Sequence, residues 1–464
     1  MLSETPASEL PFYSNLGSYI SEIEKLPTVI KEGRVIQVIG HMIEATNPGC
    51  SVGGMCKIFN PTTKSSIVAE VVGFRKDRIL IMPLHNAHGI GPKCRVISED
   101  RPAMVPVGEG LLGRVVDPLM RPMDGLGELL TSTEVPLYPE VVNPLNRRRI
   151  KKTLDVGVRS INACLTCGRG QRIGIMAGSG VGKSVLLGMM ARYTDADINV
   201  IALVGERGKE VREFIEDNLG EEGMSRSIVI VATSDQPPLL RMRGAYIATS
   251  IAEHFRNEGH DVLLSMDSLT RFAMAQREIG LAAGEPPTTK GYPPSVFAML
   301  PGLLERTGTH DGPGSITGFY TVLVEGDDTN DPIADAIRAI VDGHIILSRE
   351  IADKGTYPAI DLLSSTSRVM VDVVSEKHIK LNQIMRRTLA TYKEAEDLIN
   401  IGAYVQGSNP EIDYAIKKKP LIQEFVQQEM SEETSLKECA EQILQIFGDQ
   451  LEDNATEENS ANQK

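Results

Sequence analysis

The stretch AGSGVGKS, at residues 177–184, constrains this chain more than any other feature of the sequence. It follows an apolar run at residues 172–176 that predicts a buried strand, and it precedes residues 185–190, which predict the start of a helix. A glycine-rich loop between a strand and a helix is the setting of a phosphate-binding P-loop, because backbone N–H groups and the helix dipole then face the anion. The order of elements therefore predicts a nucleotide site at the end of a sheet strand.

The residues of this loop suit a nucleoside triphosphate together with its metal ion. Lys183 would pair with the β- and γ-phosphates, and the Ser184 hydroxyl would ligate Mg²⁺. Ala177 stands where the strict pattern has its first glycine, and its small side chain should still let the loop close. The residues expected to bind the nucleotide are Gly178, Ser179, Gly180, Val181, Gly182, Lys183, Ser184 and Val185.

The composition limits the class of protein. The chain has 464 residues, 41% of them hydrophobic, which suits a globular protein of more than one domain. Its net charge of −14 argues against a protein that holds nucleic acid mainly by neutralising phosphates. The N-terminus has no basic segment followed by an apolar core, and no apolar run approaches the length of a membrane span. The sequence therefore predicts a soluble, intracellular protein.

Six scattered cysteines give little support to a zinc or redox site. Cys164 and Cys167 form the single CxxC, and no second such pair or histidine pair lies at zinc-finger spacing. A redox dithiol is the alternative. Because free cysteines usually behave as small apolar residues, packing just before the P-loop strand is the favoured interpretation.

The N-terminal third of the chain divides into three parts. Residues 1–27 predict an amphipathic helix that ends at Pro27, and this helix either packs on its own domain or docks on a partner or a membrane surface. Residues 28–100 contain short runs rich in Val and Ile between Gly, Asn and Pro clusters, which predict a small β-barrel or sandwich. Residues 101–142 form a connector rich in glycine and proline.

The rest of the chain predicts a large α/β domain followed by helices. Within residues 143–376, apolar strands alternate with helical stretches, which predicts a parallel sheet with the nucleotide at the carboxyl ends of its strands. The expected strands are 173–176, 198–204, 228–232, 262–266, 316–324 and 343–347. Residues 377–447 predict a helical domain, and residues 448–464 a disordered acidic tail. The helices expected in that domain are 381–400, 410–430 and 436–447.

Two carboxylates and one arginine outside the P-loop are candidates for catalysis. Asp267 ends an apolar strand, where a Walker B aspartate would orient the Mg²⁺ shell, and the alternative is an ordinary helix N-cap. Glu206 follows a strand at a glycine turn, and it is either a base that polarises the attacking water or a surface residue beside Arg207. The spacing of Arg368 fits both a surface arginine and an arginine finger.

Six blocks of the sequence closely resemble the type III secretion and flagellar protein-export ATPases, relatives of the catalytic subunits of rotary ATP synthases. In chain order the blocks are GSGVGKS, GERGKEV, SMDSLTR, GLAAGEPPTTKGYPPSVF, VEGDDTNDPIAD and GTYPAIDLLSSTSRVM. The resemblance covers about residues 33–447. It implies a RecA-like α/β P-loop ATPase core with a parallel sheet, an N-terminal β-barrel and a C-terminal helical domain, in an enzyme that acts as a homohexamer.

The resemblance also implies roles for individual residues. Glu206 matches the glutamate that activates water, Asp267 matches the Walker B aspartate, and Arg368 matches the arginine that reaches the γ-phosphate on a neighbouring subunit. Tyr357 matches an aromatic residue that stacks on adenine, and Arg207 is similar to the residue that couples the catalytic glutamate to the next subunit. The implied cofactors are ATP and Mg²⁺.

The partners implied by the resemblance belong to a protein-export machine. The N-terminal helix would bind a stator-like regulator, and the helical C-terminal domain would face a central stalk protein, the export gate, chaperones and exported proteins. The enzyme would be cytoplasmic, with peripheral contact at the inner face of the cytoplasmic membrane, and would bind no nucleic acid. Met299 and Gly302 stand where the family often has charged residues, which bears on charge pairs between subunits and not on hydrolysis.

Two other functions stay open on the sequence. One is the catalytic subunit of a rotary, ion-translocating ATP synthase, which the block GLAAGEPPTTKGYPPSVF and the N-terminal helix disfavour. The other is a hexameric RNA translocase, which should carry basic and aromatic RNA-contacting segments near its N-terminus. The acidic balance and sparse aromatic residues disfavour that function, and RNA-stimulated hydrolysis would favour it.

Overall fold

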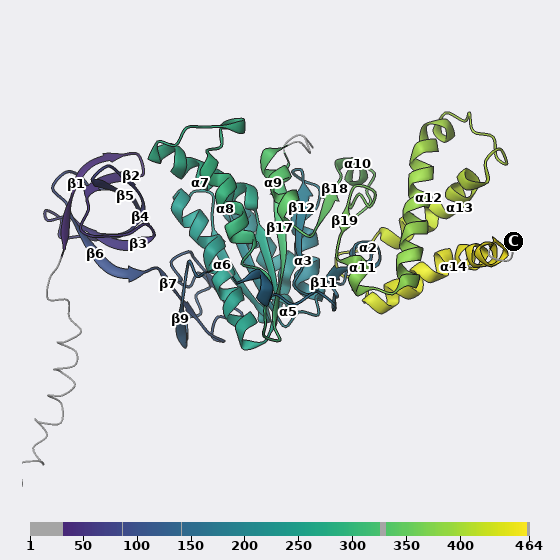
Figure 1. Cartoon of the computed structure of the whole chain (residues 1–464), viewed down its shortest axis with the longest axis horizontal. Coiled ribbons are helices and arrows are strands. Elements are labelled where there is room, and N and C mark those ends of the chain that lie inside the picture. The colour runs from purple at the N-terminus through teal and green to yellow at the C-terminus, as the bar shows by residue number, and fades with distance from the viewer. Residues whose placement is uncertain (1–30, 86, 141, 325–330, 462–464) are drawn as a thin grey trace, which may run out of the picture. The chain divides into compact units, whose positions relative to one another are not determined.

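The chain divides into two units, Met1–Pro102 and Ala103–Lys464, which Figure 1 draws in one view. The computed structural model describes residues 31–85, 87–140, 142–324 and 331–461, so the helix expected at residues 1–27 lies outside the described part. Within those described residues, no helix is both long enough and apolar enough to cross a membrane.

The first unit is a closed barrel of six antiparallel strands in the order β1-β2-β5-β4-β3-β6. The strands are β1 (Glu32–Ile39), β2 (Met42–Thr46), β3 (Gly54–Phe59), β4 (Ser66–Arg75), β5 (Arg78–Pro83) and β6 (Arg95–Pro102). Ile43, Ile58 and Ile81 are fully buried in its core. Pairing of β1 with β6 closes the sheet and leaves no free edge, which confirms the expected barrel.

The second unit is built on a nine-stranded sheet in the order β19-β18-β12-β17-β15-β13-β14-β8, with β16 beside β17. Its inner strands are parallel and buried on both faces, and they are therefore almost wholly apolar. The larger strands are β12 (Arg172–Ala177), β13 (Ile198–Val204), β14 (Ser227–Ala232), β15 (Asp261–Asp267), β17 (Ser315–Leu323) and β18 (Gly343–Leu347). The short ones are β8 (Val115–Val116), β16 (Gly308–Thr309) and β19 (Thr366–Ser367). The predicted parallel-sheet core is confirmed.

Helices connect these strands, and the longest, α6 (Pro238–Glu258), packs along β13 and β15. The others that border the nucleotide domain are α2 (Arg159–Cys164), α3 (Lys183–Tyr193), α4 (Gly208–Glu213), a π-helical turn (Phe214–Leu219), α5 (Gly220–Ser225), α7 (Leu269–Ala283), α8 (Pro294–Leu304), α9 (Pro332–Ile340), α10 (Arg349–Asp353) and α11 (Met370–Val373). Because these strands are parallel, their carboxyl ends lie on the same side of the sheet, and ligands bind on that side in such folds.

The connector expected at residues 101–142 is part of the second unit instead of a link between domains. Strand β7 (Met104–Val107) pairs with β9 (Thr133–Pro136), and β8 joins the edge of the large sheet beside β14. A bidentate ion pair between Arg114 and Asp124, with Nε–Oδ2 at 2.8 Å, closes the loop that follows β8. The interleaved apolar residues of this segment therefore pack on the nucleotide domain.

The C-terminal helices are α12 (Glu376–Asn400), α13 (Pro410–Val426) and α14 (Leu436–Ala461), drawn in light green and yellow in Figure 1. Two expectations are wrong here. Helix α13 ends at Val426 and not at residue 430, and α14 continues to Ala461 although a disordered tail was expected from residue 448. Phe447 is fully buried and Leu451 packs beside it, so the apolar stripe of α14 extends past the expected end of the helix.

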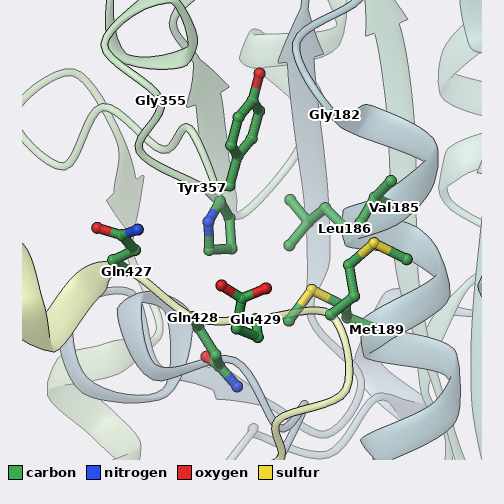
Figure 2. Close-up of a pocket in the computed structure, with 11 residues that line it drawn as sticks. Gly182, Val185, Leu186, Met189, Gly355, Tyr357, Gln427, Gln428 and Glu429 are labelled. Atoms are coloured by element: carbon green, nitrogen blue, oxygen red, sulfur yellow. The ribbon is translucent and has the colours of Figure 1, made fainter.

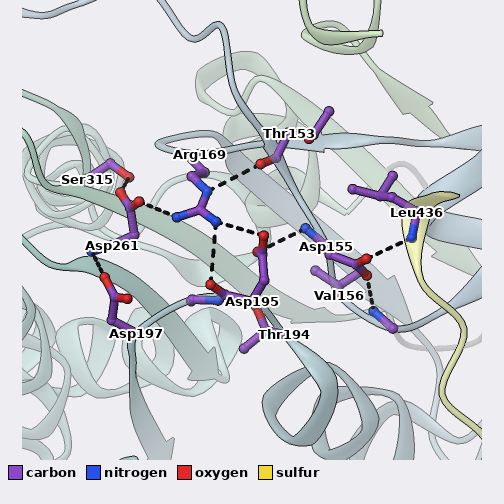
Figure 3. A network of polar contacts seen from close by, with 12 residues as sticks. Thr153, Asp155, Val156, Arg169, Thr194, Asp195, Asp197, Asp261, Ser315 and Leu436 are labelled. Atoms are coloured by element: carbon purple, nitrogen blue, oxygen red, sulfur yellow. Dashed lines mark hydrogen bonds and ion pairs between the residues drawn. The ribbon is translucent and has the colours of Figure 1, made fainter.

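A polar network ties the start of α14 to the amino ends of the sheet strands (Figure 3). Arg169 pairs with Asp261, the first residue of β15, and donates to Asp195 Oδ2 at 2.7 Å. Asp195 accepts the backbone N–H of Asp155 at 3.1 Å, and Asp155 in turn accepts the N–H of Leu436 at 2.7 Å. The helical domain is thereby hydrogen-bonded to the nucleotide domain far from the P-loop.

Candidate active site

The P-loop connects β12 to α3, as the sequence predicts. Gly182 forms the N-cap of α3 in the left-handed region, with φ of 89°, a conformation that side chains other than glycine rarely adopt. Residues 183–185 then begin the helix with N–H groups that have no partner within it, whereas the Leu186 N–H donates to Gly182 O at 3.0 Å. The loop is therefore arranged to hold an anion at the carboxyl edge of the sheet.

Lys183 brings together the two carboxylates that the sequence singled out. Its Nζ lies 2.6 Å from Asp267 Oδ1 and 3.4 Å from Glu206 Oε1. Asp267 ends β15 and Glu206 follows β13, the neighbouring strand, so their side chains meet at one edge of the sheet. Asp267 Oδ1 also accepts the Thr321 hydroxyl at 2.7 Å, which fixes the carboxylate.

Burial and charge set the protonation of this cluster. Burial alone would lower the pKa of Lys183, but the Asp267 and Glu206 carboxylates outweigh it and raise the pKa, so the ammonium stays charged. Burial, and then the negative charge of Asp267, raise the pKa of Glu206 to about 7, although Lys183 opposes the shift. A carboxylate with a pKa near neutral pH is suited to accept a proton from water.

The oxygen atoms near the P-loop fit a magnesium ion that arrives with phosphates. Ser184 lies in the first turn of α3, and the Asp267 carboxylate lies beside Lys183. Within the part of the chain that the structure describes, no three Asp, Glu, His or Cys residues form a metal-binding group. Mg²⁺ is commonly held by one or two protein oxygens together with substrate phosphates, so a hydroxyl and a carboxylate suffice.

A cavity of about 320 Å³ lies against the P-loop, and Figure 2 shows its lining. Val185, Leu186 and Met189 of α3 form one side, and Tyr357 with Pro358 forms the other. The Tyr357 ring lies at the end of the P-loop, because a Cβ added to Gly182 would come within 3.4 Å of its Cδ1. An aromatic ring opposite aliphatic side chains can stack on the flat face of a nucleotide base.

Four residues of the C-terminal domain complete this cavity, and sequence reasoning missed them. Residues 427–430, named the strap from here on, line it directly after α13. The sequence predicts a helix that includes them. One local feature indicates that the helix ends earlier. Ala415, Ile422 and Phe425 form its buried apolar face, whereas the next position on that face is the exposed Glu429.

Arg207 does not join the cluster of Lys183, Glu206 and Asp267. Its side chain is 82% exposed and lies 3.8 Å from Glu210 in an ion pair on the surface of α4. Within this single subunit it touches neither the P-loop nor the cavity.

Arg368 lies near the amino ends of the parallel strands, whereas the P-loop lies at their carboxyl ends. It directly follows β19, where Ser367 pairs with Gly343, the first residue of β18. Gly343 in turn lies beside Ile173, near the start of β12, whereas the P-loop follows the end of that strand. The Arg368 side chain is exposed, and its position excludes a contact with the P-loop of its own subunit.

The cysteines take no part in the site. All six are free and buried, and burial raises the pKa of Cys164 to about 12. A thiol with so high a pKa is a poor nucleophile at neutral pH, which agrees with the packing interpretation of the CxxC.

Family models match the barrel, most of the nucleotide domain and most of the helical domain. The nucleotide-binding domain of the ATP synthase alpha/beta family matches residues 157–367, and the β-barrel domain of that family matches residues 35–99. The C-terminal domain of the type III secretion ATPase EscN matches residues 374–445. The match at the C-terminus separates this chain from ATP synthase subunits proper.

Curated relatives agree over almost their full length. The chain is 52% identical to the flagellum-specific ATP synthase of Bacillus subtilis, over 93% of this chain and 99% of that protein. It is 50% identical to the flagellum-specific ATP synthase of Salmonella typhimurium, over 93% of this chain and 97% of that protein. It is 47% identical to the type 3 secretion system ATPase of Xanthomonas euvesicatoria, over 97% of this chain and 100% of that protein.

Solved structures of type III secretion ATPases resemble this chain in fold and in sequence. The assembled ATPase EscN from the type III secretion system of enteropathogenic E. coli aligns with a TM-score of 0.85 at 44% identity, over 89% of this chain and 99% of that one. EscN in complex with its central stalk EscO aligns with a TM-score of 0.82 at 43% identity. The chain therefore belongs to the family of flagellar and type III secretion ATPases, within the ATP synthase alpha/beta family.

Proposed function

We propose that this chain is a subunit of a homohexameric ATPase that hydrolyses ATP to ADP and phosphate to energise the unfolding and export of proteins through a flagellar or type III secretion apparatus. The observation that carries the enzymatic part is the contact of Lys183 with Asp267 and Glu206 at the P-loop edge of the sheet. The export part rests on the family, whose relatives are named as flagellar and type III secretion ATPases.

In this proposal each residue of the cluster has a separate task. Lys183 and the backbone of residues 178–185 bind the triphosphate, and Tyr357 stacks on adenine. Glu206 takes a proton from the attacking water, and its pKa of about 7 suits that step. Ser184 and Asp267 would hold Mg²⁺, which when bound neutralises charge on the phosphates.

Arg368 then acts between subunits. It lies at the amino ends of the parallel strands, away from its own P-loop at their carboxyl ends, which supports a role at the P-loop of a neighbouring subunit. An arginine there would stabilise the charge on the transferring phosphoryl group. The exposed Arg207 is available for the same interface. The structures of assembled EscN support a ring of this kind.

The partner of the helical domain is proposed to be a central stalk, as the complex of EscN with EscO suggests. Leu398, Ile401 and Val405 are exposed where α12 turns into α13, with Ile401 75% exposed. Exposed apolar residues grouped at a helix end mark a protein contact site. We assign the stator-like regulator and the peripheral membrane contact to residues 1–27, and the chaperones, exported proteins and export gate to the helical domain.

The test is ATP hydrolysis by two variants. Lys183→Ala should abolish phosphate release while circular dichroism stays unchanged, because the terminal phosphates lose their cation. Glu206→Gln should bind ATP with Mg²⁺ yet hydrolyse it about 10²–10⁴-fold more slowly, because an amide cannot accept the proton. Near-normal turnover of Lys183→Ala, or hydrolysis that depends on added RNA, would contradict the proposal.

A further inference from the structure

The middle of the strap is held by one buried side chain, that of Gln428, which is 4% exposed. Its Nε2 donates to Gly157 O at 2.8 Å and to Glu432 O at 2.7 Å, and its Oε1 accepts the Arg159 N–H at 2.8 Å. All the hydrogen-bonding capacity of the Nε2 group is thus used within the protein, which leaves this side chain no donor for a ligand.

The backbone of Gln428 also bonds to Tyr357, which lines the cavity beside the P-loop, named the base cavity from here on. The N–H of Gln428 donates to the carbonyl of Tyr357 at 2.9 Å. The ring that faces α3 across the cavity is therefore fixed to the strap, although 71 positions separate the two in the sequence. Figure 2 shows the two segments meeting at the lower side of the cavity.

Further contacts hold the flanks of the strap. Arg159 forms a bidentate ion pair with Glu432 and donates to Gln427 O at 2.6 Å. At the end of α3, Arg192 donates to Met430 O at 2.5 Å. The Tyr193 hydroxyl donates to the same carbonyl at 3.2 Å. The strap is therefore bonded at Gln427 and Met430, and between them its position depends on Gln428.

We propose that Gln428 is a positioning residue for the base subsite: by holding the strap against Tyr357 it determines how tightly the site holds a nucleotide base, without taking part in hydrolysis. The inference rests on the proposed ATPase function. It assigns the affinity for the base to a contact between the nucleotide domain and the helical domain, whereas the phosphates are held by the P-loop alone.

The physical reason is preorganisation. A base gains stacking energy only if the tyrosine ring and the opposite aliphatic wall are already at the right separation. Without the Gln428 side chain, Gly157 O, Glu432 O and Arg159 N–H each lose a partner, and the strap moves to satisfy them. Tyr357 moves with its carbonyl, while the P-loop, which has no bond to Gln428, keeps its geometry.

The test compares ATP with inorganic tripolyphosphate, which carries the phosphates but no base. For Gln428→Leu we expect the KM for ATP to rise about tenfold with kcat unchanged, because a displaced Tyr357 ring stacks less well on the base while the P-loop still binds the phosphates. The inhibition constant of tripolyphosphate against ATP hydrolysis should stay at the wild-type value. A fold defect would raise both constants.

Two further variants make the result decisive. Gln276→Leu is the matched control, since Gln276 is also buried and hydrogen-bonded, to Ser295 Oγ at 3.0 Å on α8, but lies outside the base cavity. It should lower thermal stability and leave both constants unchanged. Glu432→Ala removes the ion pair to Arg159 from a half-exposed position, and it should raise the KM for ATP by a smaller factor. If Gln428→Leu fails to fold, the KM for ATP of Glu432→Ala tests the proposal instead.

Three outcomes would overturn the inference. They are an unchanged KM for ATP, an equal rise of the KM for ATP and the inhibition constant of tripolyphosphate, and a similar rise in the KM for ATP of Gln276→Leu. None of these outcomes bears on the proposed function, which fails if the wild-type protein does not hydrolyse ATP, if Lys183→Ala remains active or if hydrolysis depends on added RNA.

Discussion

Burial changes the acid–base chemistry of Glu206, because it raises the pKa of this carboxyl group. Its side chain is 14% exposed, and one ammonium group faces it together with the carboxylates of Asp267 and Glu210. The pKa of about 7 is the balance of burial and these charges. A group that must be ionised to take a proton then loses its activity just below neutral pH.

We expect kcat/KM for ATP to fall about tenfold for each pH unit below 7, because only ionised Glu206 can accept the proton and kcat/KM reports the free enzyme. The nucleotide itself titrates near pH 6, since the second pKa of a phosphate lies at about 6. The pH dependence of ATP binding by Glu206→Gln shows the titration of the nucleotide alone, and it therefore separates that effect from the titration of Glu206. A kcat/KM that stays flat between pH 6 and 8 would contradict the role of Glu206 as base.

The meeting of Lys183, Glu206 and Asp267 could be predicted because each lies at or shortly after the end of a strand. In a parallel sheet the carboxyl ends of β12, β13 and β15 meet at one edge, so Lys183, Glu206 and Asp267 converge whatever the intervening loops do. The strap could not be predicted in this way. Its position depends on hydrogen bonds from Gln428 to residues about 270 positions away, and no local pattern encodes such contacts.

At the scale of elements, the turn that follows β13 controls where Glu206 points. Gly205 has φ of 73°, and a Cβ added there would lie 2.7 Å from Arg271 Cβ at the start of α7. We expect Gly205→Ala to cost about 1–2 kcal/mol of stability from the left-handed conformation alone. Its kcat should fall by roughly a hundredfold, because a displacement of about 1 Å in a catalytic group has such an effect.

The measurements are a urea titration and steady-state phosphate release. Gly302→Ala on α8 is the matched control, because no atom lies within 4 Å of the added Cβ and alanine favours a helix. It should be at least as stable as the wild type and equally active. Full activity of Gly205→Ala would mean that the turn has no part in orienting Glu206.

The limits of prediction at this scale lie at the ends of elements. The buried strand β13 was predicted with its observed bounds, Ile198–Val204, because seven consecutive buried residues leave a strong pattern. The end of α13 was missed, since Gln427 adopts an extended conformation to enter the strap. The sequence does not predict that the connector joins the large sheet, because the two residues of β8, Val115 and Val116, are too few to indicate a strand.

At the scale of the whole molecule, we propose that each active site is shared by two subunits, because Arg368 lies far from the P-loop of its own subunit. Arg368→Ala should bind ATP and assemble normally, yet lose about 10³–10⁵-fold in turnover, as expected for a missing arginine finger. Mixing it with Lys183→Ala should restore part of the activity. In randomly mixed rings, about a quarter of the interfaces combine an intact P-loop with an intact arginine.

The measurement is steady-state ATP hydrolysis of the co-assembled mixture against each variant alone, with mixed rings verified by cross-linking. Specific activity of the wild type should also rise with protein concentration as rings form. Mixed rings without a gain in activity would assign Arg368 to its own subunit or to no site at all.

The connection between α13 and α14 contacts the nucleotide domain at the base cavity, through the strap, and at the polar network of Figure 3, through Leu436. Helix α12 is bonded to the same domain as well, since the His378 ring bonds to Ala163 O at 2.7 Å and Arg386 donates to Ser365 O at 3.0 Å. The helical domain is therefore attached at several separate places. Force that a partner applies to this domain would reach the Tyr357 carbonyl through the Gln428 N–H, and a shift of that carbonyl would change the width of the space in which the base stacks.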